Sequence, residues 1–191
     1  MLASGFESVP PISPRDLDAM LSIAHGVGTQ VLERLANGDP TAQDFPVAAV
    51  AYDLRTGNAY PGYAQDQYLG DPTAHAERMA AKAAKEEGVD PDGLIFITGL
   101  EPCDDCLIWM GEDGVPHVTY VVDRQSLALM GLVKAHPLDA FEQAARGRAE
   151  GRRYPTLSRV DDPNWQGAFL SLFANVHRDP ISEAVTYKPK T

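Results

Sequence analysis

Three side chains with zinc-binding chemistry lie in two short stretches of the sequence. Residues 71–77, DPTAHAE, supply His75, and residues 100–106, LEPCDDC, supply Cys103 and Cys106, the only two cysteines of the chain. One imidazole and two thiolates fill three positions of a tetrahedral zinc site and leave the fourth open. Structural zinc sites usually close with four protein ligands, whereas catalytic sites keep a position for water. The ligand set therefore predicts a catalytic zinc centre.

A carboxylate stands beside this ligand set, because Glu77 is separated from His75 by a single alanine. At that spacing Glu77 can reach a water on the metal without being a ligand itself, which suits a general acid–base group. Each motif alone is weaker evidence. H-A-E occurs by chance in alanine-rich helices, and C-x-x-C also fits a redox pair, half of a zinc knuckle or two buried small side chains. The order of the motifs, with Pro102 directly before the first cysteine, favours the zinc interpretation.

Length and composition indicate one globular domain. The chain has 191 residues, of which 44% are hydrophobic, and it contains no apolar run near the roughly 20 residues that cross a bilayer. The first residues lack a basic region followed by an apolar core, so they do not resemble a signal peptide. Two cysteines in C-x-x-C spacing without an export signal suit a reducing compartment. We expect a cytoplasmic protein.

The charge of the chain argues against a polynucleotide partner. The formal net charge is −11 and the pI is about 4.7. Nucleic-acid binding usually rests on Lys and Arg side chains that neutralise phosphates. The densest basic group is interrupted by Glu150 and is interpreted as a solvated helix face; it comprises Arg146, Arg148, Arg152 and Arg153. A small-molecule substrate is the expected partner.

The elements that position the motifs alternate between helices and strands, which predicts a mixed α/β sheet with helices on its faces. Ser13 and Pro14 carry the capping signals of a first helix, and Gly38 is a natural stop. Phe45 and Trp109 are interpreted as core aromatics. In chain order we expect a helix over 13–37, a strand over 45–53, a hairpin turn over 54–58, a strand over 59–63, a polar loop over 64–73, a helix from His75 to Gly88, a strand over 94–98, a helix over 104–110, a strand over 118–122, and helices over 125–133, 138–148 and 164–173.

Both motifs are expected at helix N-termini. A helix starting at His75 would direct its partial positive charge at the metal and favour the carboxylate of Glu77. A helix starting after Pro102 and Cys103 would lower the thiol pKa and favour the thiolate that a metal requires. We expect a single domain over 1–191, with a core at about 13–150 and a C-terminal helical extension at about 151–191.

The two motifs resemble the cytidine deaminase-like superfamily, whose signature is H-x-E followed by P-C-x-x-C. DPTAHAE with LEPC is most similar to the branch of tRNA adenosine deaminases, guanine deaminases and fungal cytosine deaminases. The resemblance implies a three-layer sandwich with a mixed sheet of about five strands, a homodimer, and hydrolysis of an amine to a carbonyl with release of ammonia. It further implies that His75, Cys103 and Cys106 hold Zn²⁺, that Glu77 carries the proton to the leaving amine, and that the Ala76 N–H and the Pro102 carbonyl contact the substrate.

The resemblance leaves the substrate open. The branch usually has an asparagine at the end of the second strand that contacts the base, whereas this chain has Ala64 and Gln65 there, and Gln65 offers the same donor and acceptor groups on a longer arm. The leading hypothesis is a deaminase of a free nucleobase, nucleoside or related amino-heterocycle, with guanine first. The alternatives are a tRNA adenosine deaminase and, in another class, a structural zinc module completed by one of the remaining histidines.

Overall fold

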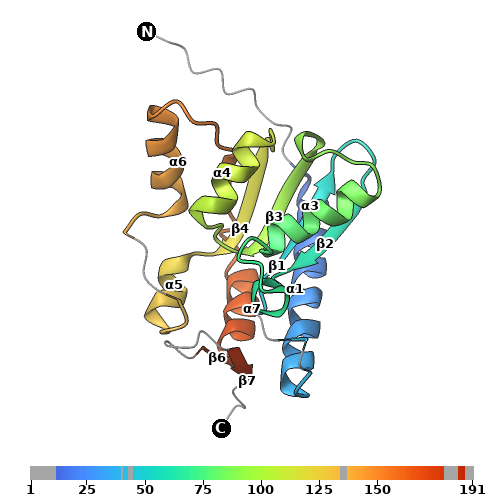
Figure 1. Cartoon of the computed structure of the whole chain (residues 1–191), viewed down its shortest axis with the longest axis vertical. Helices are drawn as coiled ribbons and strands as arrows, with labels where there is room; N and C mark the ends of the chain where they lie inside the picture. The colour runs from blue at the N-terminus through green and yellow to red at the C-terminus, as the bar shows by residue number, and fades with distance from the viewer. Residues whose placement is uncertain (1–11, 40, 43–44, 134–136, 179–184, 188–191) are drawn as a thin grey trace.

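A five-stranded mixed sheet forms the centre of the computed structural model, which describes residues 12–39, 41–42, 45–133, 137–178 and 185–187 (Figure 1). The strand order is β2-β1-β3-β4-β5. β1 is antiparallel to both β2 and β3, whereas β4 is parallel to both β3 and β5. The strands are β1 (Ala48–Asp53), β2 (Ala59–Tyr63), β3 (Leu94–Leu100), β4 (His117–Val122) and β5 (Thr156–Arg159).

Helices cover both faces of this sheet, so the expected three-layer sandwich is confirmed (Figure 1). Helices α1 (Pro14–Ala36) and α7 (Pro163–Phe173) pack against one face. Helices α3 (Ala76–Glu86) and α4 (Asp104–Glu112) pack against the other, with α6 (Ala140–Ala149) beside α4. The shorter elements are α2 (Asp66–Leu69), η1 (Pro91–Gly93), α5 (Arg124–Leu129) and the separate pair β6 (Val176–Arg178) and β7 (Val185–Tyr187).

Alternation along β1 shows how the sheet divides the core. Val50 lies in the cluster beneath α1 and α7, while Ala49 and Ala51 lie in the cluster beneath α3. Successive strand residues point to opposite faces, so a strand covered on both sides is apolar throughout. The two small alanines leave room for α3 to lie close to the sheet. Gly62 in β2 serves the same end, because a Cβ there would lie 2.3 Å from the backbone nitrogen of Ala80.

The first helix follows its capping signals. Ser13 accepts a hydrogen bond from the backbone N–H of Asp16 at 3.1 Å, and α1 ends at Ala36 with Asn37 as its C-cap. The strand expected over 45–53 begins only at Ala48. The polar loop expected over 64–73 contains a short helix, α2, which its few apolar residues did not indicate.

The expectation of a C-terminal helical extension at about 151–191 holds for α7 and is wrong for the segment before it. Residues 156–159 form β5, which pairs with β4 and completes the central sheet. This strand is short and none of its side chains is fully buried, so it lacks the apolar run by which β3 and β4 are recognised. Within the described parts of the chain, no helix combines the length and apolar character needed to span a membrane.

Candidate metal centre and active site

Two helix N-termini bring the three expected zinc ligands together. His75 is the N-cap of α3 and Cys103 is the N-cap of α4, while Cys106 lies in the first turn of α4. His75 Nδ1 lies 3.2 Å from Cys106 Sγ and 3.4 Å from Cys103 Sγ. These three side chains form the one group of possible metal ligands found in the described residues, with all ligand atoms within 4.8 Å of one another.

The spacing of these atoms fits tetrahedral zinc. With Zn–N near 2.0 Å and Zn–S near 2.3 Å, an imidazole nitrogen and a thiolate sulfur on one tetrahedral ion lie about 3.5 Å apart. The two distances from His75 Nδ1, 3.2 and 3.4 Å, are close to that separation. A set of one nitrogen and two sulfur donors is also the chemistry that zinc prefers over magnesium or calcium. The donor set thus fits the metal predicted from the sequence.

The hydrogen bonds among the three ligand residues stabilise Cys103 as a thiolate. Hydrogen bonds from Cys106 and then from His75 lower the pKa of Cys103 to about 4. The same bond to Cys103 raises the pKa of His75 to about 9. Sharing its proton with Cys103, together with burial, raises the pKa of Cys106 well above its usual range. Metal binding therefore releases the protons of Cys106 and His75, because a metal takes thiolates and neutral imidazole.

Glu77 lies directly beside the cluster. Its side chain is 4% exposed, and its Oε2 accepts a hydrogen bond from Cys106 Sγ at 3.6 Å. Burial first, and then the negative charge of Cys103, raise the pKa of Glu77 above its ordinary value. A buried carboxyl group whose pKa is raised holds its proton more readily than an exposed one, which suits a group that takes up and releases a proton during a reaction. Glu77 has the position and protonation behaviour of a proton carrier.

A cavity of about 190 Å³ opens in front of His75, Glu77 and Cys103. Its wall combines apolar and charged side chains from several elements. The apolar part includes Phe45, Val47, Leu100 and Val133, and the polar part includes Asp66, Gln67, Glu101 and Arg124. A concave, largely apolar pocket with a few polar groups beside perturbed titratable residues is the usual form of a small-molecule site.

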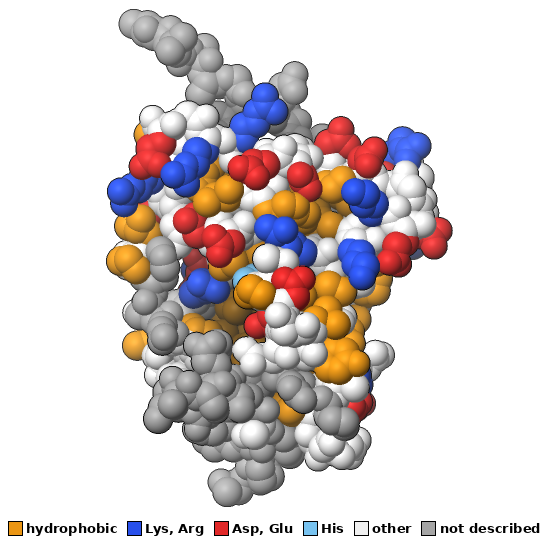
Figure 2. Space-filling model, in the orientation of Figure 1, with side chains coloured by type: hydrophobic (Ala, Val, Ile, Leu, Met, Phe, Trp, Pro, Cys, Tyr) orange, Lys and Arg blue, Asp and Glu red, His pale blue; other side chains and the backbone are white. Residues whose placement is uncertain are grey.

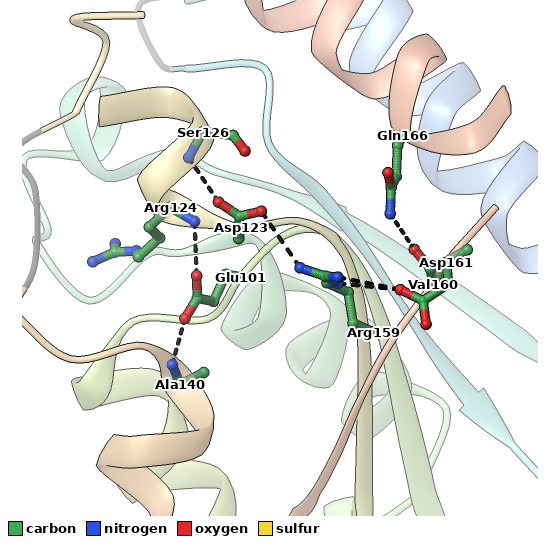
Figure 3. Close-up of polar contacts among 9 residues, drawn as sticks. All are labelled: Glu101, Asp123, Arg124, Ser126, Ala140, Arg159, Val160, Asp161 and Gln166. Atoms are coloured by element: carbon green, nitrogen blue, oxygen red, sulfur yellow. Dashed lines mark hydrogen bonds and ion pairs between the residues drawn. The ribbon is translucent and has the colours of Figure 1, made fainter. Parts of the chain in front are cut away.

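Glu101 ties this wall to the metal loop (Figure 3). Its buried carboxylate accepts the backbone N–H of Arg124 at 2.7 Å and the backbone N–H of Ala140. These amides belong to the first residues of α5 and α6. Because Glu101 precedes Pro102 and Cys103, one side chain links the start of both helices to the ligand-bearing loop.

Of the residues expected to contact the substrate, some line the cavity and others do not. Ala76 lines the cavity, whereas Pro102 is buried between two lining residues, Glu101 and Cys103, and is not itself part of the wall. Gln65 is the N-cap of α2 and does not line the cavity either, while Ala64 does. The polar side chains presented from this segment are therefore those of α2.

Two aromatic residues differ in their roles. Phe45 stacks on Phe173 with ring centroids 5.2 Å apart and also lines the cavity, so its interpretation as a core residue was incomplete. Trp109 packs edge-on against Phe96, with the Arg78 guanidinium 5.0 Å from its ring centre, and takes no part in the cavity wall.

The remaining histidines give no fourth ligand within the described part of the chain. His117 Nε2 lies 2.9 Å from Ser158 Oγ and 3.2 Å from Thr119 Oγ1, and the metal cluster does not include it. His25 packs edge-on against Phe169. His136 and the side chain of His177 lie outside the described residues.

Sequence reasoning missed Glu101 and Arg124. Glu101 was readable as part of the LEPC motif, but nothing local showed that its carboxylate would be buried against two distant amides. Arg124 follows a buried strand, and the carboxyl ends of strands are where α/β sheets place their ligand sites. The position of Arg124 just after a buried strand was therefore the sequence feature that could have identified it.

Comparison with known proteins agrees with this geometry. The family described as the cytidine and deoxycytidylate deaminase zinc-binding region matches residues 27–122, just over half of the chain, and this span contains all three ligands and Glu77. The chain belongs to this family. It is therefore a zinc-dependent deaminase of the cytidine deaminase fold, and this membership argues against the structural zinc module. No curated protein sequence matches the chain significantly.

Solved structures share the fold at low identity. A structure from a study of A-to-I editing by tRNA:A34 deaminases has a TM-score of 0.59 and 17% identity, covering 81% of this chain and 99% of its own. Guanine deaminase from Nitrosomonas europaea has a TM-score of 0.56 and 18% identity, covering 85% and 92%. A diaminohydroxyphosphoribosylaminopyrimidine deaminase/reductase from Thermotoga maritima has a TM-score of 0.51 and 22% identity, covering 83% and 39%. At these identities the likeness extends to the fold and not to the substrate.

Proposed function

We propose that this deaminase acts on a small free amino-heterocycle, and that guanine is the first compound to test. The observation that carries the proposal is the buried carboxylate of Glu77 beside the ligand cluster, at the wall of a cavity of about 190 Å³. Pockets for drug-sized ligands typically measure about 300–1,000 Å³. The smaller volume favours a single base over a nucleotide.

Each residue of the site has a role in this proposal. His75, Cys103 and Cys106 hold the zinc, which when bound supplies a hydroxide nucleophile by lowering the pKa of water. Glu77 would take a proton from the attacking water and deliver it to the departing nitrogen. The oxygen of water adds to the ring carbon, the carbon–nitrogen bond breaks, and ammonia leaves a carbonyl behind. The Ala76 N–H at the cavity wall, and the backbone carbonyl of Pro102 between the wall residues Glu101 and Cys103, are the groups proposed to orient the substrate.

The alternative substrate is an adenosine in tRNA, which the DPTAHAE motif favours. Charge opposes it, because the net charge is −11. Figure 2 shows basic and acidic side chains interspersed over the visible face, without a continuous basic field. Guanine and related bases need no phosphate contacts, so they suit an acidic protein better.

The test is ammonia release from a panel of amino-purines, amino-pyrimidines, pterins and triazines. Glu77→Gln keeps the size of the side chain but cannot accept a proton, so turnover should fall by at least about 10²–10⁴-fold. Its zinc content and folding should be preserved, since Glu77 is not a ligand. The control is Glu86→Gln, an exposed glutamate at the far end of the same helix. A Glu77→Gln enzyme with near-wild-type turnover would remove Glu77 from the mechanism.

The metal is tested separately. The purified protein should carry about one zinc per chain, because the three donors form one site. Replacing both Cys103 and Cys106 by serine should abolish zinc retention, measured by elemental analysis. Zinc that persists in the double variant would disprove the assignment of these two ligands.

We extend the proposal to the state of the whole protein: a single deaminase domain that works in the cytoplasm as a homodimer. Large apolar side chains are exposed near the start of α6 and the end of α5, where Phe141 is 45% and Leu129 is 81% exposed. Exposed apolar side chains mark contacts between proteins where they form a contiguous patch, and we propose that Phe141 and Leu129 contribute to one at the dimer interface. Sedimentation equilibrium gives the subunit number, and a monomer at all concentrations would refute the dimer.

A further inference from the structure

Arg124 presents an unused guanidinium to the active-site cavity. It lines the same cavity as His75 and Glu77. Its Nε is buried and has no hydrogen-bond partner among the described residues. A buried polar atom without a partner is uncommon in folded proteins. The Arg124 side chain thus lies at the cavity wall without a hydrogen bond or ion pair among the described residues.

The acidic neighbours of Arg124 are already engaged elsewhere. Glu101 accepts two backbone amides, one of them from Arg124 itself. Asp123 accepts the backbone N–H of Ser126 at 2.7 Å and lies 3.7 Å from Arg159. Figure 3 shows the Arg124 side chain extending away from both carboxylates. No salt bridge joins it to any carboxylate in the described ranges, so its donors are not needed to hold the fold together.

The other polar positions around the cavity increase the need for such a donor. Ala64, where the second strand ends, lines the cavity but offers no hydrogen-bonding side chain, and Gln65 is not part of the wall. Asp66, Glu77 and Glu101 contribute carboxylates. Among the charged side chains described along the wall, Arg124 is the cation that can donate several hydrogen bonds to a substrate.

We propose that Arg124 is a specificity-determining residue that recognises two adjacent acceptors, a ring carbonyl oxygen and a neighbouring ring nitrogen, on the edge of the substrate away from the reacting amine. The inference rests on the proposed function. A guanidinium is a planar fork of donors that matches paired acceptors, and the O6 and N7 atoms of guanine form such a pair. When the 2-amine of guanine lies beside Glu77, the edge that carries O6 and N7 faces another part of the cavity wall.

A neutral edge fits this cavity better than an anionic group. Three carboxylates and one guanidinium line it, and the charge of a bound zinc would be offset by its two thiolate ligands, so a carboxylate or phosphate on the substrate would meet more negative than positive charge. A neutral carbonyl beside a ring nitrogen can accept hydrogen bonds from the guanidinium without adding charge. The structure thus favours oxo-substituted amino-heterocycles over their phosphorylated derivatives.

The test compares guanine with 2-aminopurine, which has the same 2-amine and lacks the oxygen at position 6. Binding is measured by calorimetry on zinc-loaded Glu77→Gln protein, and ammonia release on zinc-loaded wild type. A bidentate arginine contact discriminates by about 1–3 kcal/mol, which is about 5- to 150-fold. We expect guanine to be preferred by that factor in both measurements. Arg124→Gln should abolish the preference by weakening guanine and leaving 2-aminopurine nearly unchanged.

Two controls separate recognition from folding. Arg15→Gln, at an exposed position on α1, should leave the preference intact. Zinc content and the thermal midpoint of Arg124→Gln should match wild type, because no side-chain bond of Arg124 supports the fold. Should that variant not fold, the wild type still decides with 2,6-diaminopurine, whose amine at position 6 offers a donor where Arg124 needs an acceptor. Binding of 2,6-diaminopurine as tight as that of guanine overturns the inference.

The two hypotheses fail in different ways. Ammonia release that does not distinguish guanine from 2-aminopurine, or a preference unchanged in Arg124→Gln, overturns the role of Arg124 and leaves the deaminase proposal standing. Arginine-dependent binding of guanine without any ammonia release overturns guanine as the substrate and supports the acceptor-edge recognition. If neither guanine nor 2-aminopurine binds, the inference is overturned.

Discussion

Removing the carboxylate of Glu101 should destabilise the protein more than the loss of one hydrogen bond would. Glu101→Ala deletes the acceptor of two backbone amides at once, those of Arg124 and Ala140. Both amides stand at the start of a helix, where backbone N–H groups have no partner within the helix itself. The substitution therefore leaves two donors without a replacement.

The size of the effect follows from the burial of the two bonds. A buried donor that loses its acceptor costs about 1–3 kcal/mol. The bond to Ala140 is buried and that to Arg124 is partly buried beside the cavity, where water can replace the carboxylate in part. Together they give a loss of about 2–5 kcal/mol in the free energy of unfolding. Glu101→Gln keeps one acceptor oxygen and should lose about 1–3 kcal/mol.

Urea unfolding of zinc-loaded protein measures these differences, and the thermal midpoint should fall by about 2–4 °C per kcal/mol in a chain of this length. Zinc content should stay near one per chain in both variants, since Glu101 is not a ligand. The matched control is Glu86→Ala, at an exposed position of α3. A Glu101→Ala protein within about 0.5 kcal/mol of wild type would refute the reasoning, as would a glutamine variant no more stable than the alanine variant.

Three further outcomes are expected. Gly62→Ala should lower both the stability of the protein and its zinc affinity, since the new Cβ would lie 2.3 Å from the Ala80 nitrogen and push α3 outwards. Denaturation and zinc titration measure these two effects, and an unchanged zinc affinity would contradict the prediction. Hydrogen bonds from Thr41 and then Arg34 lower the pKa of Asp39 to about 2. The ionised carboxylate therefore stabilises the fold fully above about pH 4, and this stabilisation is lost as the pH falls through 2. Asp39→Asn should thus be less stable than wild type at about pH 6, and the difference in stability should shrink in acid. The protein should show no tight, salt-dependent gel shift with tRNA, because few phosphates could be neutralised, and a shift that weakens steeply with salt would favour the tRNA alternative.

The parts of the fold that sequence could predict are those with local signals. The first helix has a capping serine and proline, and β3 and β4 are apolar runs, so each was found within a few residues. β5 has no such signal, because its identity as a strand depends on pairing with β4 rather than on its own side chains. Tertiary pairing decides short, half-exposed strands.

The candidate site divides in the same way. The spacing of H-x-E and C-x-x-C predicted the zinc ligands because both motifs begin helices, and a helix start fixes where its first side chains point. The remainder of the cavity comes from α2, from the segment before β1 and from the start of α5. No local pattern connects these segments, since only the packing of the sheet and its helices brings them together.

The dual hydrogen bonding of Glu101 implies that chemistry and selectivity can change independently along this chain. The zinc ligands and Glu77 are encoded within residues 75–106, whereas the Arg124 side of the wall is encoded downstream, and Glu101 holds it through the backbone amides of Arg124 and Ala140. A backbone amide is supplied by every residue type except proline. The side chain of Arg124 can therefore be replaced without losing this anchor, whereas buried residues downstream such as Leu127 and Ala140 belong to the core. A directed-evolution library at Arg124 and Val133, the two cavity-lining positions of the downstream stretch, should therefore alter the preferred base while the zinc ligands and Glu77 stay unchanged.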